Sequence, residues 1–238
     1  MTEIVDMIYN SGDAEKCCRD TIYKRVPYIE MNVSGGNHLE SLPSPRLMKT
    51  HLPFQLMPQS FWEKNCKVIY VARNAKDLAV SYFFFHKILK TLPDTGPWET
   101  FLTNFMKGDV SYGSWYDHVK GWWENRHNYQ ILYLFYEDLK EDPKREIRKV
   151  GKFLQRDLSE EVLEKIVYHT SFEKMKMNNM ANYRSIPHTL LDQSTRSFMR
   201  KGVVSDWENH FTVAQNELFD EDYQRQMSAT SLLFRTKI

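Results

Sequence analysis

The sequence has few cysteines, no long apolar run and almost no net charge. Cys17, Cys18 and Cys66 form neither a disulfide framework nor a metal-ligand spacing, which favours a reducing compartment. No apolar run reaches about 18 residues, and no signal segment opens the chain, so neither a membrane span nor secretion is predicted. A formal net charge of +1 gives no overall basic field, so nucleic acid is not predicted as a partner. We therefore expect a cytoplasmic protein.

Apolar strands alternate with helical segments along the chain. Hydrophobic residues at 42% and aromatic residues at 14% predict a packed globule. Two apolar runs, 67–73 and 131–136, predict buried parallel strands, and a third short strand is predicted to end at His51. Helices are predicted over 1–12, after Asn74, and over 98–106, 114–123, 143–154, 159–170 and 213–228. This pattern predicts one α/β domain over residues 1–238, with a parallel β-sheet flanked by helices.

The segment Arg46–Pro53 places a cation, a hydroxyl and an imidazole together. If a strand ends here, Lys49, Thr50 and His51 leave the sheet at the carboxyl ends of its strands, where α/β proteins bind ligands. By itself this motif is a weak signal, and a histidine that is hydrogen-bonded to backbone at the end of a strand is the commoner explanation. Further polar residues at the same edge would favour a functional site.

Two more predicted strands deliver Arg73 and Tyr136 to that edge. Arg200 and Lys201 could reach it from the poorly periodic segment 171–202, although a solvated Arg-Lys pair is the commoner explanation. Guanidinium groups match phosphate oxygens bidentately, and a nearby serine hydroxyl can add another bond. The residues therefore indicate a site for a phosphorylated nucleotide, with His51 available as a base.

Four stretches of the chain together resemble the cytosolic sulfotransferases, most closely the phenol and estrogen sulfotransferases. They are Lys49–Pro53 (KTHLP), Tyr70–Asp77 (YVARNAKD), Phe135–Asp138 (FYED) and Phe198–Gly202 (FMRKG). The resemblance runs from Met1 to Ile238, and the motifs keep the order and spacing of the family. It implies a fold similar to that of the P-loop nucleotide kinases.

The resemblance also implies transfer of a sulfuryl group from 3′-phosphoadenosine 5′-phosphosulfate (PAPS) to a hydroxyl or amine. The product would be 3′-phosphoadenosine 5′-phosphate (PAP), and no metal is implied. His51 would be the general base, because an ordinary imidazole is largely neutral at pH 7, and Lys49 would neutralise charge on the transferring group. The implied nucleotide-binding residues are Arg73 and Ser81 at the 3′-phosphate, Phe198, Met199, Arg200, Lys201 and Gly202 closing over it, Tyr136, and Thr170 and Phe172 beside the adenine.

The acceptor pocket of this family is apolar and aromatic. Matching positions here are Tyr23, Tyr28, Met31, Lys49, Thr50, His51, Phe84, Phe85, Tyr112 and Tyr183. Tyr28 and Met31 stand where members that prefer phenols often carry phenylalanine, which predicts a more polar and flexible pocket. We expect a small phenol as acceptor, with steroids or iodothyronines as further candidates for this enzyme of xenobiotic and steroid metabolism.

The chain departs from the family pattern at both ends. The loop that binds the 5′-phosphosulfate, Lys-(Ser/Ala)-Gly-Thr-Thr-Trp after the first strand, should lie just before Met1 and is absent. Losing several such donors predicts little or no activity for this chain alone, since one donor is typically worth roughly 100- to 1,000-fold in rate. Near the other end, Ser205 replaces a glycine and Glu208 replaces a lysine that begins the family's dimer-forming segment, here Glu208 to Glu217. A homodimer is still predicted, weakened by this charge inversion.

Two functions of different classes follow. The first is a PAPS-dependent sulfotransferase with His51 as its base. The alternative is a truncated, non-catalytic remnant that binds PAP or a sister subunit without turnover. A nucleotide kinase would need a glycine-rich loop that ends in Gly-Lys-(Ser/Thr), and the sequence has none.

Overall fold

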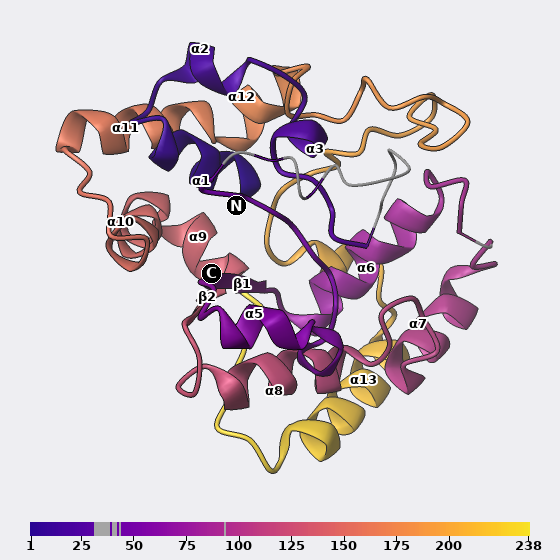
Figure 1. The fold of residues 1–238 in the computed structure, drawn as a ribbon. Coiled ribbons are helices and arrows are strands. Elements are labelled where there is room, and N and C mark those ends of the chain that lie inside the picture. The colour runs from indigo at the N-terminus through magenta and orange to yellow at the C-terminus, as the bar shows by residue number, and fades with distance from the viewer. Residues whose placement is uncertain (31–38, 40–41, 43, 93) are drawn as a thin grey trace. The chain divides into compact units, whose positions relative to one another are not determined.

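The computed structural model describes residues 1–30, 39, 42, 44–92 and 94–238 (Figure 1). The chain forms two compact units. Unit 1 comprises Met1–His51, Pro143–His188 and Gln193–Met199, and unit 2 comprises Leu52–Asp142, Thr189–Asp192 and Arg200–Ile238. That both belong to one sulfotransferase domain stays a prediction.

Unit 2 contains the sheet. Strands β1 (Val68–Ala72) and β2 (Ile131–Phe135) lie side by side and run parallel, with Val68 opposite Ile131 and Ala72 opposite Phe135 (Figure 1). Both are runs of apolar and aromatic residues, as expected of strands that are covered on their faces. The predicted α/β fold with a parallel sheet flanked by helices is therefore confirmed, with two strands in the described part of the chain.

The helices of unit 2 build its core. They are α5 (Gln59–Glu63), α6 (Ala75–His86), α7 (Trp98–Lys107), α8 (Trp115–Asn125), α9 (Tyr136–Glu141) and α13 (Val213–Met227), with the short 3₁₀ helices η1 (Phe54–Leu56) and η2 (Asp206–Asn209). Asn74, Ser114 and Thr212 cap α6, α8 and α13, because each side chain accepts a hydrogen bond from the first turn of its helix. Buried side chains of α6, α7, α8 and α13 form one hydrophobic cluster around Phe101, Tyr116 and Phe219.

Unit 1 consists of helices around a small apolar core. They are α1 (Thr2–Tyr9), α2 (Ala14–Cys17), α3 (Ile22–Arg25), α10 (Pro143–Phe153), α11 (Glu160–His169) and α12 (Phe172–Met177). α1 contacts both α10 and α11, and Met7, Ile147, Val150, Leu163 and Ile166 are almost fully buried. Arg25 is also buried, and it forms ion pairs with Glu3 and Asp6 of α1 that fix α3 on this core.

The long helices lie where the sequence predicts them, and four of the short ones were missed. The predictions for 1–12, 98–106, 114–123, 143–154, 159–170 and 213–228 correspond to α1, α7, α8, α10, α11 and α13. Helices α3, α5, α9 and α12 have six residues or fewer. A segment of this length completes less than two turns, so it shows little of the 3.6-residue periodicity on which the prediction depends.

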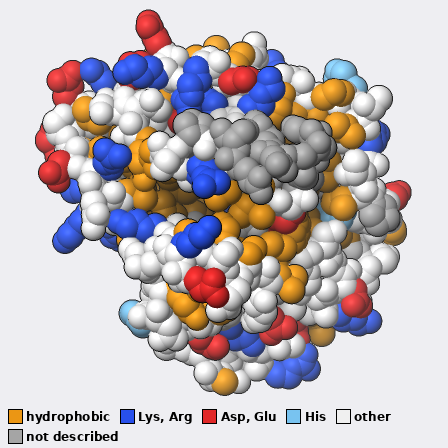
Figure 2. All heavy atoms as spheres, viewed as in Figure 1, with side chains coloured by type: hydrophobic (Ala, Val, Ile, Leu, Met, Phe, Trp, Pro, Cys, Tyr) orange, Lys and Arg blue, Asp and Glu red, His pale blue; other side chains and the backbone are white. Residues whose placement is uncertain are grey.

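Charges of both signs lie on one face of the molecule. Figure 2 shows both Lys or Arg and Asp or Glu side chains spread over the face that it draws, in keeping with the net charge of +1. Among the described residues, no helix has the length and apolar character needed to cross a membrane.

Candidate active site

Arg73 lies directly after β1, at the carboxyl end of the sheet. The register places Ala72 beside Phe135, so Arg73 and Tyr136 follow neighbouring parallel strands. The guanidinium carbon of Arg73 lies 4.5 Å from the centre of the Tyr136 ring, and Nη2 donates a hydrogen bond to the Val203 carbonyl oxygen at 2.8 Å. Arg73 Nε is buried without a hydrogen-bond partner in the described part of the chain. The structure thus brings Arg73 and Tyr136 together as their strands predict.

Arg200 and Lys201 form ion pairs with one buried carboxylate, that of Asp206. Arg200 Nη1 lies 2.5 Å from Oδ2, and Lys201 Nζ lies 2.6 Å from Oδ1. Asn209 donates to Oδ1 at 3.0 Å, and His210 Nε2 lies 3.4 Å from Oδ2. Burial opposes ionisation of Asp206, but the hydrogen bonds from Lys201, Arg200 and Asn209 outweigh it and hold the pKa of Asp206 well below its usual range. Asp206 therefore keeps the two cations side by side.

Asp77 joins helix α6 to the loop that carries these cations. Its buried carboxylate accepts hydrogen bonds from the backbone N–H groups of Ser205 at 2.9 Å and Trp207 at 3.0 Å. The Asn74 side chain caps α6 at the Asp77 N–H, and its Nδ2 donates to Asp77 and to Glu137, at 2.9 and 2.8 Å. One buried hydrogen-bond network thus connects the ends of β1 and β2 with the loop.

Both departures from the family motif near the C-terminus have partners in unit 2. Gly202 and Ser205 have φ values of +64° and +70°, a left-handed conformation that glycine adopts freely and other residues adopt at a cost of roughly 1–2 kcal/mol. Ser205 Oγ donates to the Thr236 carbonyl oxygen at 3.0 Å, a bond that the family's glycine could not form. Glu208, which replaces a lysine, pairs with Lys237 at 2.5 Å.

Ser81, Phe84, Phe85 and Tyr112 are the other candidate residues of unit 2. Ser81, Phe84 and Phe85 lie on α6, and Ser81 is half-buried two turns into the helix, as predicted. The Phe84 ring centre lies 5.0 Å from the guanidinium carbon of Arg200, so this ring borders the cations. Tyr112 is 40% exposed and has a φ of +67°.

Lys49, Thr50 and His51 lie in unit 1, in an extended segment that pairs with residues 27–29. Lys49 forms an isolated parallel bridge with Tyr28, in which Ile29 N donates to Lys49 O and Lys49 N donates to Pro27 O, both at 2.9 Å. The prediction that a buried strand of the sheet ends at His51 is therefore wrong. Only two apolar residues precede Lys49 in the segment, and the backbone hydrogen bonds of Lys49 go to the extended residues 27–29.

The carboxylate of Glu30 binds Thr50 and His51, the two residues that follow Lys49. Its Oε1 accepts hydrogen bonds from Thr50 Oγ1 at 2.9 Å and from the backbone N of His51 at 2.6 Å. Its Oε2 is buried and has no hydrogen-bond partner among the residues that the structure describes. Sequence reasoning missed Glu30, although a single charge within the apolar and aromatic stretch Val26–Met31 could have signalled it.

Aromatic rings surround Lys49 and His51. Lys49 Nζ lies 4.4 Å from the centre of the Tyr28 ring and 5.8 Å from that of Tyr183, and the His51 ring meets Tyr28 edge-on at 5.2 Å. Burial lowers the pKa of Lys49 to about 8, while the charge of Glu30 acts in the opposite direction. The structure therefore gathers Tyr28, Lys49, His51 and Tyr183 into one cluster.

Tyr23 and Phe198 extend this cluster. Their rings lie 6.2 and 4.5 Å from that of Tyr183, and the Tyr23 hydroxyl is 3.4 Å from Ser185 Oγ. Phe198, implied at the nucleotide, thus packs against Tyr183, implied at the acceptor. Whether these two residues line the implied nucleotide and acceptor subsites stays a prediction.

Four candidate residues remain, all of them implied at the nucleotide or at the acceptor. Thr170 ends α11 and donates its hydroxyl to Ile166 O at 2.7 Å, and Phe172 begins α12, where its ring lies 5.6 Å from Lys176 Nζ. Met199 is half-buried. Met31 lies outside the described residues.

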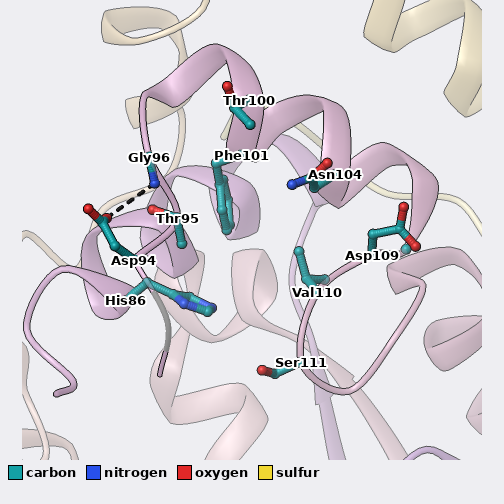
Figure 3. Close-up of a pocket in the computed structure, with 11 residues that line it drawn as sticks. His86, Asp94, Thr95, Gly96, Thr100, Phe101, Asn104, Asp109, Val110 and Ser111 are labelled. Atoms are coloured by element: carbon teal, nitrogen blue, oxygen red, sulfur yellow. Dashed lines mark hydrogen bonds between the residues drawn. The ribbon is translucent and has the colours of Figure 1, made fainter. Parts of the chain in front are cut away.

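A separate cavity of about 580 Å³ in unit 2 contains none of the candidate residues. It is lined by the end of α6, one face of α7 and residues 94–96 and 108–111, and Figure 3 shows the His86 ring pointing into it. Within the described ranges, no group of three or more His, Cys, Asp or Glu side chains could hold a metal ion.

In unit 2, cations follow the strands of a parallel α/β sheet, at the edge where proteins of this fold class bind ligands, and their charge suits an anionic ligand. Comparison with known families gives the particular class. The "Sulfotransferase domain" family model matches residues 1–231. The chain belongs to the sulfotransferase family.

Relatives match over the whole chain. Rat "Sulfotransferase 1 family member D1" is 58% identical over 242 residues, which cover 100% of this chain and 82% of that protein. Human "Sulfotransferase 1C2" is 57% identical over 236 residues, which cover 98% of this chain and 80% of that protein. The identity over these lengths confirms the resemblance to the cytosolic sulfotransferases.

Solved structures share the fold. Mouse sulfotransferase SULT7A1, complexed with PAP, has a TM-score of 0.73 at 39% identity, covering 82% of this chain and 69% of that one. Retinol dehydratase, in complex with androsterone and the inactive cofactor PAP, has a TM-score of 0.87 at 26% identity, covering 98% of this chain and 78% of that one.

Proposed function

We propose that this chain transfers a sulfuryl group from PAPS to the hydroxyl of a small phenol or a related aromatic acceptor. The observation that carries the proposal is the cluster of Arg73, Tyr136, Arg200 and Lys201 in unit 2, tied together by buried hydrogen bonds. Arginine and lysine side chains that are pre-positioned in this way suit the 3′-phosphate of the nucleotide. The PAP bound to SULT7A1 and to retinol dehydratase supports the same ligand class.

His51 is the proposed general base and Lys49 the proposed electrostatic partner. The acceptor O–H proton passes to the imidazole as the acceptor oxygen bonds to sulfur. The bond between sulfur and the phosphate oxygen of PAPS breaks, and PAP leaves. Sulfuryl transfer resembles phosphoryl transfer in placing attacking and leaving oxygens in line, so positioning and charge supply most of the catalysis. The cationic form of Lys49 stabilises negative charge on the transferring group.

The proposed acceptor is a small aromatic hydroxyl or amine. The rings of Tyr23, Tyr28 and Tyr183 beside Lys49 and His51 supply apolar surface and hydroxyl groups for such a molecule. Retinol dehydratase, whose structures contain androsterone or retinol, extends the range of test compounds to steroids and isoprenoid alcohols.

Two assays on the purified chain test the proposal. Turnover is measured with PAPS and 4-nitrophenol, and PAP affinity is measured by calorimetric titration. Any turnover, which the absent 5′-phosphosulfate loop should keep low, is expected to be abolished in His51→Ala. Arg73→Ala should bind PAP at least tenfold more weakly, because a charge-assisted hydrogen bond is worth about 1.5–3 kcal/mol. Lys140→Ala, which removes an exposed cation of α9, is the matched control and should keep the wild-type affinity.

The outcomes separate the two functions. PAP binding that depends on Arg73, without turnover for any acceptor tested, would support the non-catalytic binding protein. A folded chain that neither binds PAP nor turns over would refute both proposals.

We further propose a homodimer through the segment Glu208–Glu217 and a cytoplasmic location. Val213 and Leu218 are 76% and 59% exposed, which leaves apolar surface in and beside this segment. A sedimentation equilibrium that gives only the 28.4 kDa monomer at micromolar concentration would contradict the dimer. The three cysteines are free thiols, in keeping with a reducing compartment.

A further inference from the structure

We propose that Glu30 is a positioning residue for the general base, holding the backbone of Thr50 and His51 through two hydrogen bonds to one carboxylate oxygen. This inference rests on the proposed function, in which His51 takes the acceptor proton. Neither the sequence motifs nor the family resemblance pointed to Glu30. The structure alone shows it beside the catalytic segment.

The contacts fix the segment at successive residues. The Lys49 backbone is held by the bridge to Tyr28, with hydrogen bonds to Pro27 and Ile29. Glu30 follows Ile29, and its Oε1 takes the next two donors, the Thr50 hydroxyl at 2.9 Å and the His51 N–H at 2.6 Å. A hydrogen bond to an ionised carboxylate is shorter and roughly twice as strong as a neutral one. These bonds therefore fix the backbone from Lys49 to His51, whose imidazole is the proposed base.

The second oxygen of Glu30 supports a role beyond local structure. Oε2 is buried and lacks a hydrogen-bond partner within the described residues, and burying such a group is costly. A carboxylate kept in this state also contributes negative charge near Lys49, whose pKa it raises against the effect of burial. Glu30 thus holds the position of His51 and helps to keep Lys49 cationic.

The hydroxyl of Thr50 takes part in the same attachment. This hydroxyl, expected at the acceptor, donates to Glu30. Thr50 and the His51 backbone are then two points of attachment to the same oxygen. Losing both attachments lets the imidazole move relative to the acceptor, and a displacement of about 1 Å can cost about 100-fold in rate.

The test compares Glu30→Ala with Glu30→Gln in the full chain. Alanine removes the acceptor atom, whereas the Gln carbonyl oxygen can accept the same two bonds. We expect Glu30→Ala to lower kcat at least tenfold, with the KM for 4-nitrophenol and the Kd for PAP within about twofold of wild type. Glu30→Gln should restore kcat to within about threefold, and the remaining loss comes from the negative charge that it removes near Lys49. Glu15→Ala, which removes an exposed carboxylate from the same unit, should leave all three values unchanged.

Amide hydrogen exchange at His51, measured by NMR, tests the geometry without turnover. The His51 N–H should be protected in wild type and Glu30→Gln and should lose at least tenfold in protection in Glu30→Ala, while α1 amides stay protected. A wild-type chain without turnover would count against the proposed function, and this exchange experiment would still decide the role of Glu30. Unchanged protection or unchanged kcat in Glu30→Ala would overturn the inference, as would a Glu30→Gln variant as impaired as Glu30→Ala. If Glu30→Ala does not fold, Glu30→Gln decides alone: wild-type kcat and protection support the inference, and loss of either overturns it.

Discussion

Replacing Lys49 with methionine should make the protein more stable and less active. Burial lowers the Lys49 pKa from its ordinary value of 10.5 to about 8. At 1.36 kcal/mol per pH unit, keeping the charged form in the folded protein costs about 3 kcal/mol at pH 7. Methionine retains an unbranched side chain of similar length without the charge. It loses the cation–π contact with Tyr28, worth about 1 kcal/mol, so the free energy of unfolding should rise by about 2 kcal/mol.

The rise in unfolding free energy that Lys49→Met should produce depends on pH. The folded pKa lies below the unfolded one, so between pH 8 and about 10.5 the unfolded chain binds more protons at Lys49 than the folded chain does. The stability of the wild type therefore rises with pH across this window, as the cost of the charge disappears. The advantage of Lys49→Met should be full at pH 7 and mostly lost by pH 10.

Urea titrations at pH 7 and pH 10 measure both effects. Lys152→Met, which replaces an exposed lysine of α10, is the matched control and should change the free energy of unfolding by less than about 0.5 kcal/mol at either pH. A Lys49→Met variant that is less stable than wild type at pH 7, or whose gain is the same at pH 10, would refute the reasoning. Turnover should fall in the same variant, because the proposed partner of the transferring group is gone.

Two further substitutions probe the network in unit 2. Asp206→Asn should cost about 2–3 kcal/mol in unfolding free energy at pH 7, because it removes the charge that pairs with two cations. The pKa of Asp206 is lowered in the folded protein, so its contribution to stability is present above about pH 4 and is lost as the pH falls further. Urea titrations should show a smaller difference in unfolding free energy between wild type and Asp206→Asn at pH 3 than at pH 7. A difference that stays constant would contradict this. Asn74→Ala should cost about 2–3 kcal/mol, more than the roughly 1 kcal/mol of Ser114→Ala, because Asn74 caps α6 and also donates to Glu137. Equal losses in chemical denaturation of the two cap variants would show that the Glu137 bond adds nothing.

Local features of this protein could be predicted from its sequence. The strands β1 and β2 are continuous apolar runs, and Asn74 and Ser114 stand directly before helices. Because β1 and β2 are parallel neighbours, the meeting of Arg73 with Tyr136 followed from the strand prediction.

Contacts between distant residues that do not follow from the pairing of the predicted strands could not be predicted. Lys49 pairs with Tyr28 and not with a strand of the sheet, and which extended segment pairs with which depends on the packing around both. Asp77 accepts hydrogen bonds from backbone N–H groups 128 and 130 residues further along the chain. Glu30 accepts hydrogen bonds from the Thr50 hydroxyl and the His51 N–H, about 20 residues further along. Backbone donors carry no residue-specific signal, so a carboxylate that binds them looks like any other acidic residue in the sequence.

The hydrogen bonds between Asp77 and the loop after Lys201 have a consequence for making hybrid enzymes. Their donors are the backbone N–H groups of Ser205 and Trp207, so the bonds do not depend on which side chains those positions carry. A donor sequence from another family member can therefore replace residues 203–205 and still be anchored, provided that α6 keeps an aspartate at position 77. Exchanging α6 for a helix without that aspartate would remove both of these bonds even if every residue of the loop were retained. The two segments form one exchangeable module, although more than 120 residues separate them in the chain.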